Sequence, residues 1–542
     1  MKKIIIWMMV ALITFSFVSC SKKDSSSTTA STASKTETVT AKSTTPSNEV
    51  VVGIPGEYGD LSPFGGNSQG RSYIKYTLWE TLAVFNEFGQ TWDKMDWVMA
   101  KNITIVDDYT TDIEIYDYIY DTNGNQIKAD DVVWSYEQAV ACGKFPKVSS
   151  NLKSMEATGE YTVRMVLNGD GLGDLEYMLS YVAIASKASY DASSDKMANH
   201  PVTTGPYKVT ESVPGSRLVL VKNDNYWQKD EEKKAYTAAQ PVDKITYNVI
   251  KETAQMAIAL ETGAIDIATS VASSEIDRFM SSDGKGKNGY LVNSTYGGQA
   301  VCLDFNCSEQ SPLSSQLLRQ AVSYAIDRGA IVAAALQGKG DTIGTPGTRA
   351  SSDYNEAWDD IDYPYNPEKA KELLKEAGYK EGQLKLRIMT EQTAEQPVVA
   401  QLIQAYLSEV GIEAEVLTYD NALFSQYRYQ PDQFDMMISI MGTSGYVVGA
   451  WDLQFNSTGT LSGGAAACFA KDEKLQELLE LAKGKNTHSE ETVEAFASYL
   501  REKDYGLGLY VKSSYSVANS KVSNIVCHPF GHLITNACTF VK

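Results

Sequence analysis

The chain is poor in the residues from which proteins build metal centres and most catalytic sites. Its 542 residues include four histidines and seven cysteines, and no two cysteines have the C-x-x-C spacing of a metal site. The sequence also lacks an H-E-x-x-H motif, a phosphate-binding P-loop and a Rossmann-type glycine fingerprint between a strand and a helix. We therefore expect no metal, no cofactor and no enzymatic activity.

Positive charge is also in short supply. The chain has 48 lysines and arginines against 68 aspartates and glutamates, which gives a formal net charge of −20. A surface of this sign repels the phosphates of nucleic acids, and no basic stripe interleaved with aromatic residues occurs. The composition therefore argues against DNA or RNA as a partner.

Hydrophobic runs long enough to matter for a membrane are confined to the first twenty residues. Met1 to Cys20 has the order of a bacterial signal peptide, with two lysines, an apolar run from Ile4 to Val18 and the ending Phe-Val-Ser-Cys. This ending resembles a lipobox, so we expect cleavage before Cys20 and a diacylglyceryl anchor on its sulfur, with ordinary secretion as the alternative. Residues 21–47 are almost wholly Ser, Thr, Ala and Lys, and are expected to form a disordered linker.

The remaining cysteines imply no disulfide framework. Cys527 and Cys538 lie close enough in the sequence to pair across a C-terminal loop, and this pairing stays open. The other cysteines are expected to be small buried apolar residues. They are Cys142, Cys302, Cys307 and Cys468.

One formal catalytic motif does occur, at residues 66–70, which read G-N-S-Q-G and so match the G-x-S-x-G nucleophile elbow. A true elbow follows a strand directly, but roughly ten loop residues separate this one from the expected strand Glu49 to Pro55. Only His200, His488, His528 and His532 could serve as the base, and the last two lie in the segment HPFGH, which its proline and glycine keep from forming a regular helix. A serine hydrolase acting through Ser68 is therefore a minor alternative.

The segment Leu303 to Pro346 carries the clearest local signals in the chain. Ser311 is a suitable N-cap for a helix with Pro312 at its first position, and Asp327 is a suitable N-cap for a second, nearly all-apolar helix. Gly338 is placed to end this second helix in a left-handed conformation. The apolar face of the first helix comprises Leu317, Leu318, Ala321, Val322, Ala325 and Ile326.

Four further positions carry local structural predictions. Asn123-Gly124 indicates a hairpin, Asp130 is the expected N-cap of the helix that follows, and Asn366 with the next proline starts another helix. Asp266 lies between two isoleucines, and we interpret it as a polar residue at a strand edge rather than a functional carboxylate.

Five stretches, in one order along the chain, resemble the family 5 extracellular solute-binding proteins, the binding components of ABC importers. The central stretch is a strand ending in Phe305-Asn306, a loop with proline, LLRQAVSYAIDR and a glycine-rich turn. The other four lie at residues 123–139, 203–227, 259–268 and 366–379. The resemblance implies a mixed α/β protein, a two-lobed type II periplasmic-binding-protein fold with an additional inserted α+β domain.

The expected domain organisation follows from the same resemblance. The chain starts in a first lobe, leaves it for an inserted domain, returns, and crosses to a second lobe before its tail crosses back. Lobe I is expected at residues 48–75, 201–298 and 508–542, the inserted domain at 76–200, and lobe II at 299–507.

The resemblance also implies ligand-binding residues. The loop of residues 68–70 lies beside the ligand cleft in the family, and the strand at residues 434–441 leads into a segment that pairs with the backbone of a bound peptide. The residues so implied are Ser68, Gln69, Gly70, Tyr296, Ile440, Met441 and Gly442.

An aspartate that binds the α-ammonium of the ligand in oligopeptide-binding relatives falls here on Ser444, which has no charge. Asp452, beside Trp451, supplies the missing carboxylate if the segment GYVVGAW folds back as a loop. Otherwise Asp452 caps a helix. A buried ammonium facing only a hydroxyl is less favoured by about 1 kcal/mol or more, so the ligand is expected either to lack a free amine or to depend on Asp452.

The function implied is capture of a small solute, most directly a short peptide, by hinge closure of the two lobes. The implied partners are an ABC permease with its ATPase subunits and, through the lipid anchor, the outer face of a bacterial membrane. The protein is expected to act as an extracytoplasmic monomer. A sensor lipoprotein of the same fold and a binder of a non-peptide solute are the alternatives.

Overall fold

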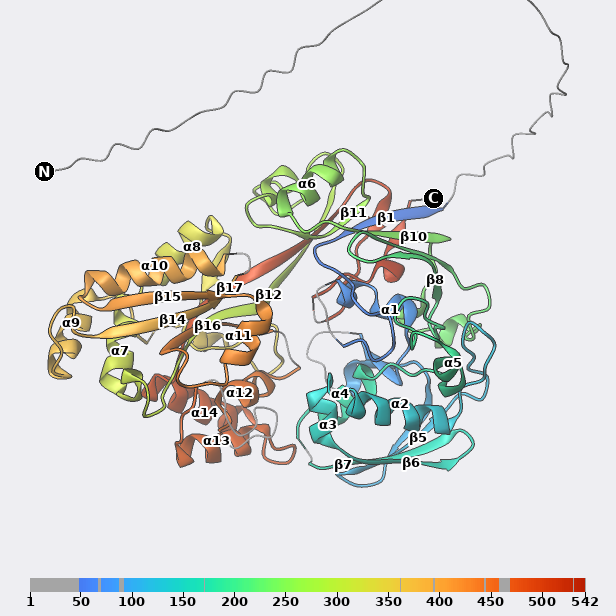
Figure 1. The fold of residues 1–542 in the computed structure, drawn as a ribbon, viewed down its shortest axis with the longest axis horizontal. Coiled ribbons are helices and arrows are strands. Elements are labelled where there is room, and N and C mark those ends of the chain that lie inside the picture. The colour runs from blue at the N-terminus through green and yellow to red at the C-terminus, as the bar shows by residue number, and fades with distance from the viewer. Residues whose placement is uncertain are drawn as a thin grey trace, which may run out of the picture. The chain divides into compact units, whose positions relative to one another are not determined.

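The computed structural model gives a mixed α/β fold (Figure 1). The residues it describes are 48–66, 70–86, 92–169, 171–360, 362–392, 395–442, 445–457, 468–529 and 531–541. The leader with Cys20 and the linker of residues 21–47 lie outside these ranges, so the anchor and linker stay predictions. No helix within the described ranges combines the length and the hydropathy that crossing a membrane requires.

One large sheet organises the fold, and its strands run in the order β15-β14-β16-β12-β17-β11-β1-β10-β9-β8, with β13 also pairing with β17. Buried apolar residues lie along these strands in two separate groups, one around β1, β9 and β10 and the other around β12, β14 and β16. The two groups are the cores of two lobes. The strands are β15 (Glu413–Tyr419), β14 (Lys385–Glu391), β16 (Met436–Gly442), β12 (Leu291–Phe305), β17 (Gly506–Ala518), β11 (Ile267–Val271), β1 (Glu49–Ile54), β10 (Lys244–Val249), β9 (Arg217–Lys222), β8 (Tyr207–Val213) and β13 (Gly340–Thr342).

The two lobes are joined by the long antiparallel strands β12 and β17, which run from one to the other in Figure 1. Their pairing is interrupted in the middle, because Thr295 pairs with Ser514 but the next pair joins Gln299 to Lys512. Three residues of β12 therefore face a single residue of β17. A bulge of this kind breaks the ladder and bends the strand, which makes this point the natural hinge.

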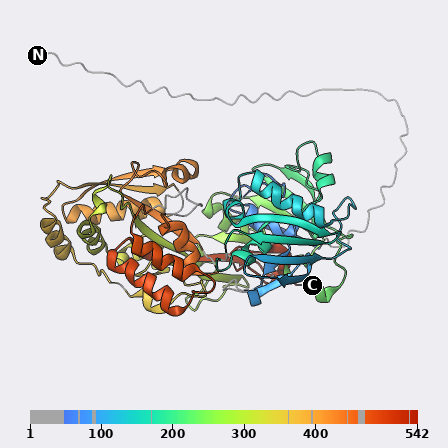
Figure 2. The ribbon, with the colours of Figure 1, turned by 90° about the horizontal axis from the view of Figure 1, so that it is seen from below.

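The segment expected as an inserted domain forms a four-stranded antiparallel sheet in the order β4-β5-β7-β6. Its core is not separate, because Ile113 and Val163 of this sheet belong to the same buried cluster as Val52 of β1. Figure 2 shows its teal elements beside the rest of the first lobe. The elements are β4 (Ala100–Ile105), β5 (Thr110–Ile115), β6 (Leu152–Gly159), β7 (Thr162–Leu167), α2 (Ala129–Ala141), α3 (Pro146–Asn151), α4 (Asp174–Tyr181) and α5 (Lys187–Ala192).

The helix-cap predictions of the second lobe are largely confirmed. The Asp327 carboxylate accepts a hydrogen bond from the Ala330 N–H at 2.9 Å and starts α8 (Arg328–Leu336), after which Gly338 is left-handed with φ +76°. Ser311 does cap Pro312, but only a 3₁₀ turn, Pro312–Ser314, follows, and α7 (Gln316–Ala325) begins after it. Asn366 caps α9 (Pro367–Glu376) by accepting from the Lys369 N–H at 3.0 Å.

One of two local predictions in the first lobe is wrong. The N-cap of α2 is Lys128, not Asp130, and the Asp131 carboxylate accepts the Lys128 N–H at 3.0 Å. The hairpin predicted at Asn123-Gly124 is present in short form, because Gly124 turns at φ +84° and Tyr120 and Gln126 on either side form an antiparallel bridge. The Asp121 carboxylate also holds the turn by accepting from the backbone of the following residues, as Asp side chains do in Asx turns.

The structural interpretation of Asp266 is confirmed. Its carboxylate is almost fully buried and accepts hydrogen bonds from the Val51 N–H and the Asn519 amide, each at 3.0 Å, while Lys521 Nζ lies 2.7 Å away. These partners come from β1 and from the end of β17. Asp266 therefore joins three strands of the first lobe.

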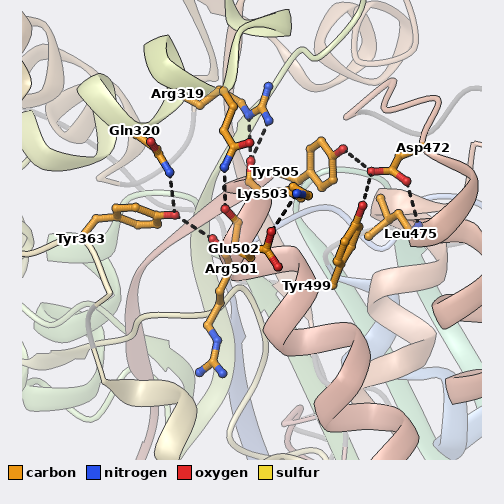
Figure 3. A network of polar contacts seen from close by, with 11 residues as sticks. Arg319, Gln320, Tyr363, Asp472, Leu475, Tyr499, Arg501, Glu502, Lys503 and Tyr505 are labelled. Atoms are coloured by element: carbon orange, nitrogen blue, oxygen red, sulfur yellow. Dashed lines mark hydrogen bonds and ion pairs between the residues drawn. The ribbon is translucent and has the colours of Figure 1, made fainter. Parts of the chain in front are cut away.

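A polar network fixes the helices of the second lobe (Figure 3). Tyr499 and Tyr505 both point toward Asp472 and donate their hydroxyls to its carboxylate at 2.9 and 2.6 Å. Arg319 of α7 donates to the Lys503 and Asp504 carbonyls at the end of α14. The remaining helices are α1 (Lys75–Leu78), α6 (Thr253–Glu261), α10 (Gln396–Glu409), α11 (Asn421–Tyr427), α12 (Val447–Phe455), α13 (Glu473–Lys483) and α14 (Glu490–Lys503).

Candidate functional site

Strand β16 has an edge to which another strand can be added. On one side it pairs with β12 along its whole length, from Phe305 opposite Met436 to Gln299 opposite Gly442. On the other side, β14 pairs only with Met436 and Met437. Within the described residues, no strand pairs with that second edge from Ile438 to Gly442, so an added strand could pair there, as at the edges to which peptides are added.

Three predicted ligand contacts lie on this edge. Ile440 is 40% exposed and Gly442 is also exposed, whereas the side chain of Met441 is buried in the lobe II core. This alternation is that of a strand with one face on the core. The edge ends next to Gln299, the residue at which β12 resumes its pairing after the hinge bulge. The edge and the hinge are thus neighbours.

The structure describes only some of the remaining predicted ligand contacts. Ser68, Gln69, Ser444 and the side chain of Tyr296 lie outside the described residues. Gly70 donates its N–H to the Glu57 carbonyl at 3.1 Å, and an added Cβ would collide with the backbone of Gly56 and Glu57. The loop thus approaches its neighbours so closely at Gly70 that only glycine fits.

The predicted role of Trp451 as a ligand contact needs correction. Residues 447–455 form helix α12 rather than a loop that folds back, and the Trp451 ring is completely buried in the core. Its Nε1 donates to the Pro346 carbonyl at 2.6 Å, and its ring packs against Trp358 and Phe496. Trp451 therefore holds α12 in place and presents no surface to a ligand.

Asp452 lies inside α12 and so does not cap it. Its carboxylate receives Lys483 Nζ at 2.9 Å and the Asn456 amide at 2.7 Å. The charge is already compensated, so Asp452 would have to exchange Lys483 for a ligand amine in order to bind one. Its part in ligand recognition remains a prediction.

The histidines that a serine mechanism would need are buried in a stack of rings. His528 Nε2 hydrogen-bonds the Tyr76 hydroxyl at 3.0 Å, and the rings of His528 and His532 stack 5.5 Å apart within 5° of parallel. Burial lowers the pKa of both, that of His532 to about 4. A metal bound to an imidazole lies in the plane of its ring, so two stacked parallel rings cannot share an ion.

A lysine that sequence reasoning missed lies beside this stack. Lys75 Nζ donates to the Tyr181 carbonyl at 3.1 Å and lies 4.7 Å above the centre of the Tyr181 ring and 5.3 Å from that of Tyr76. Burial, with a smaller effect of Arg71, lowers the pKa of Lys75 to about 7. No sequence signal marks Lys75, because Tyr181 is over a hundred residues away.

A backbone contact joins the inserted segment to the second lobe. The Leu172 N–H donates to the Lys483 carbonyl at 3.1 Å, and Gly171 and Gly484 form an isolated β-bridge. The Leu172 side chain packs against the buried cluster that contains Trp451. This contact and the β12–β17 crossing tie the two lobes together at separate points.

The six cysteines of the described residues, Cys142, Cys302, Cys307, Cys468, Cys527 and Cys538, all carry free thiols. Cys527 and Cys538 are therefore not paired in this structure. The sulfur atoms of Cys307 and Cys468 lie 3.7 Å apart.

Comparison with known proteins identifies the class. The sequence model of the bacterial extracellular solute-binding proteins, family 5, middle region, matches residues 97–461. Heme-binding protein A of Haemophilus influenzae is 27% identical over 349 residues, 60% of this chain and 60% of that protein. The dipeptide-binding protein of Escherichia coli is 26% identical over 347 residues, 59% of this chain and 61% of that protein. The chain thus spans about three fifths of the length of these two relatives.

A solved structure shows the same fold. The dipeptide-binding protein of a Pseudoalteromonas species, in complex with Met-Leu, superposes with a TM-score of 0.76 over 91% of this chain and 100% of its own, at 18% identity. The fold is therefore that of a two-lobed type II periplasmic binding protein, as the sequence predicted. The chain belongs to the family 5 bacterial extracellular solute-binding proteins.

Proposed function

We propose that this protein is the extracytoplasmic substrate-binding component of an ABC importer, and that its substrate is a short peptide. The observation that carries the proposal is the uncovered edge of β16 from Ile438 to Gly442, next to the hinge bulge of β12. A peptide added to this edge gains main-chain hydrogen bonds whatever its side chains are. Such a site suits a nutrient importer, which has to accept many sequences.

Closure of the lobes completes the proposed mechanism. The crossing strands β12 and β17 are the only connection that the chain itself makes between the lobes among the described residues, and their ladder is interrupted between Thr295 and Gln299. A peptide on β16 that also contacts the first lobe binds the closed state better than the open one. The equilibrium between the open and closed states therefore shifts toward the closed state by the difference between the two binding free energies. The permease, with its ATPase subunits, would then recognise the closed state.

The finer parts of the proposal concern location and assembly. The leader ending at Cys20 supports a lipid-anchored protein on the outer face of the cell membrane, and residues 21–47 would serve as its tether. The protein would act as a monomer, without catalysis. The family to which the chain belongs is extracellular.

Native mass spectrometry of the protein, purified without its leader from cells grown on a peptide-rich medium, tests the substrate. The expected result is added mass that falls into a family of short peptides. The main-chain mode of binding is then tested on the tightest-binding of these peptides, by N-methylation of each of its amides in turn. Each N-methyl group should weaken binding about tenfold wherever the N–H that it replaces pairs with β16. Tight binding of every N-methylated analogue would reject the β16 mode.

Haem is the second candidate ligand, because the chain is 27% identical to Heme-binding protein A over 349 residues. Addition of haemin to the purified protein, followed by its visible absorption spectrum, separates the two. A saturable spectral shift that peptides do not compete away would favour haem. A sensor role is recognised by ligand binding without any effect of a gene deletion on peptide uptake.

A further inference from the structure

Lys75 is a cation without an anion. Its Nζ has the Tyr181 carbonyl as its hydrogen-bond acceptor, and within the described ranges no carboxylate lies within ion-pairing distance of it. The nearby Lys147 makes the contrast clear. Lys147 Nζ lies at the same 4.7 Å from a tyrosine ring, that of Tyr177, but has the Asp174 carboxylate 3.3 Å away.

The charges around Lys75 make this absence costly. Arg71 opposes the protonation of Lys75, and Lys75 in turn opposes protonation of His528 and His532, so the nearest titratable groups disfavour its charge rather than compensate it. A partly buried ammonium in such surroundings is stabilised by rings and one carbonyl, which compensate less than an ion pair does. Burial of this kind without a partner is typical of positions kept for a ligand rather than for stability.

The position of Lys75 in the fold points to the ligand site. The turn that carries His528 and His532 lies against the hinge, because the site of a Cβ on Gly531 is 3.6 Å from the Thr295 methyl group. The Asn293 amide, two residues before Thr295 on β12, also donates to Cys527 Sγ at 3.2 Å. Lys75 thus belongs to the part of the first lobe that packs on β12, just before the bulge whose far side leads to the β16 edge.

We propose that Lys75 is the anion anchor of the first lobe, and that it pairs with a carboxylate of the solute when the lobes close. The substrate class is then a carboxylate-bearing solute, such as a short peptide with its free C-terminus or an acidic side chain. This inference rests on the proposed function, since it places the two ends of one ligand on β16 and on Lys75. Desolvation by the ligand makes the new ion pair strong, because competing water is removed.

The probe for the test is a pool of di- to pentapeptides from a casein digest, used as free acids and, in a second portion, with every carboxyl group converted to its methyl ester. The tightest binder of the pool is then synthesised in both forms, and its dissociation constants are measured by calorimetry. Two further forms, with only the C-terminus or only the side-chain carboxyls blocked, identify which carboxylate is bound. The proteins are the wild type, Lys75→Met, Lys75→Arg and the matched control Lys147→Met.

The expected result is at least tenfold tighter binding of the free acid than of the ester by the wild type and by Lys147→Met. Lys75→Met should lose this preference by binding the acid at least tenfold more weakly and the ester unchanged, whereas Lys75→Arg should retain most of it. Without ligand, Lys75→Met should unfold at the same or a higher temperature than the wild type, because an uncompensated cation has been removed.

Four results would overturn the inference. Equal binding of acid and ester by the wild type would reject the anion anchor but not the proposed peptide binding. The same conclusion would follow if Lys75→Met kept the preference for the acid. A Lys75→Met variant that unfolds at a lower temperature than the wild type shows that the charge is structural. If the wild type binds no peptide from either portion, the proposed function fails together with this inference.

Discussion

The contact of Leu172 with the second lobe offers a direct way to weaken closure without touching the ligand. Leu172 belongs to the first-lobe side, yet its side chain packs against the lobe II cluster and its N–H donates to the Lys483 carbonyl at 3.1 Å. If this contact forms only when the lobes close, it contributes to ligand affinity, because closure and binding are linked. Leu172→Ala should therefore weaken binding of a peptide that the wild type holds.

The size of the effect follows from the packing. The substitution removes three carbon atoms, each of which contributes about 0.8 kcal/mol when fully buried. Leu172 is only partly buried, so about half of this sum applies. The expected loss is about 1 kcal/mol, or roughly a fivefold rise in Kd. The backbone hydrogen bond is retained in this variant, so the change reports the side chain alone.

Calorimetry with the same peptide on the wild type, Leu172→Ala and the control Leu481→Ala measures this effect. Leu481 lies on α13 near the contact but is 39% exposed and has no role in it, so its truncation should leave Kd unchanged. Equal Kd values for Leu172→Ala and the wild type, with both proteins fully folded, would show that the contact does not belong to closure.

Three other predictions concern chemistry elsewhere in the chain. Burial raises the pKa of Glu80 to about 7, even though the Tyr226 hydroxyl donates to it, so the folded state holds this proton more tightly than the unfolded state. The stability that this proton contributes is complete below pH 4.5 and is lost as the pH rises to 7. The free energy of urea unfolding of Glu80→Gln should therefore equal that of the wild type at pH 4.5 and exceed it by about 3 kcal/mol at pH 8. The same difference in free energy at both pH values would contradict this. Cys20→Ser should release the protein from membranes on fractionation, and a variant that still sediments wholly with membranes would reject the lipid anchor. Diamide, which takes up the two thiol hydrogens, should join Cys307 to Cys468, whose sulfurs lie 3.7 Å apart, and peptide mapping that finds a different pair or none would show that the two thiols do not meet in solution.

Local signals predicted much of the fold because the forces behind them are local. The caps at Ser311, Asp327 and Asn366 depend on a side chain that reaches a backbone N–H two or three residues away, and all three are present. The cap at Asp130 was misplaced by two residues, because Lys128 and Asp131 share the role of capping. Helix boundaries depend on small energy differences between neighbouring capping residues, which a pattern of residue types does not resolve.

The interior of the second lobe shows where tertiary contacts outweigh local preference. The segment around Trp451 contains two glycines and reads as a loop, yet it forms α12 because the Trp451 ring fills a space between Trp358 and Phe496. Burial of a tryptophan is worth several times the cost of a glycine in a helix. These packing partners come from distant parts of the chain, so no local pattern of residues indicates them.

The candidate site divides in the same way. The β16 edge at Ile440 to Gly442 was predictable, since a resemblance placed those residues on a strand that pairs with peptides. Lys75 and Leu172 were not, because each acquires its role from a partner distant in the sequence, Tyr181 in one case and Lys483 in the other. Contacts of this range depend on how the lobes fold and meet.

The central claim is that a peptide closes the two lobes about the crossing of β12 and β17. Small-angle X-ray scattering of the leaderless protein, titrated with the peptide pool, tests it most directly. The account predicts a radius of gyration that falls saturably as peptide is added and returns when peptide is removed by dialysis. A radius that stays constant up to peptide concentrations at which calorimetry shows saturation would contradict it.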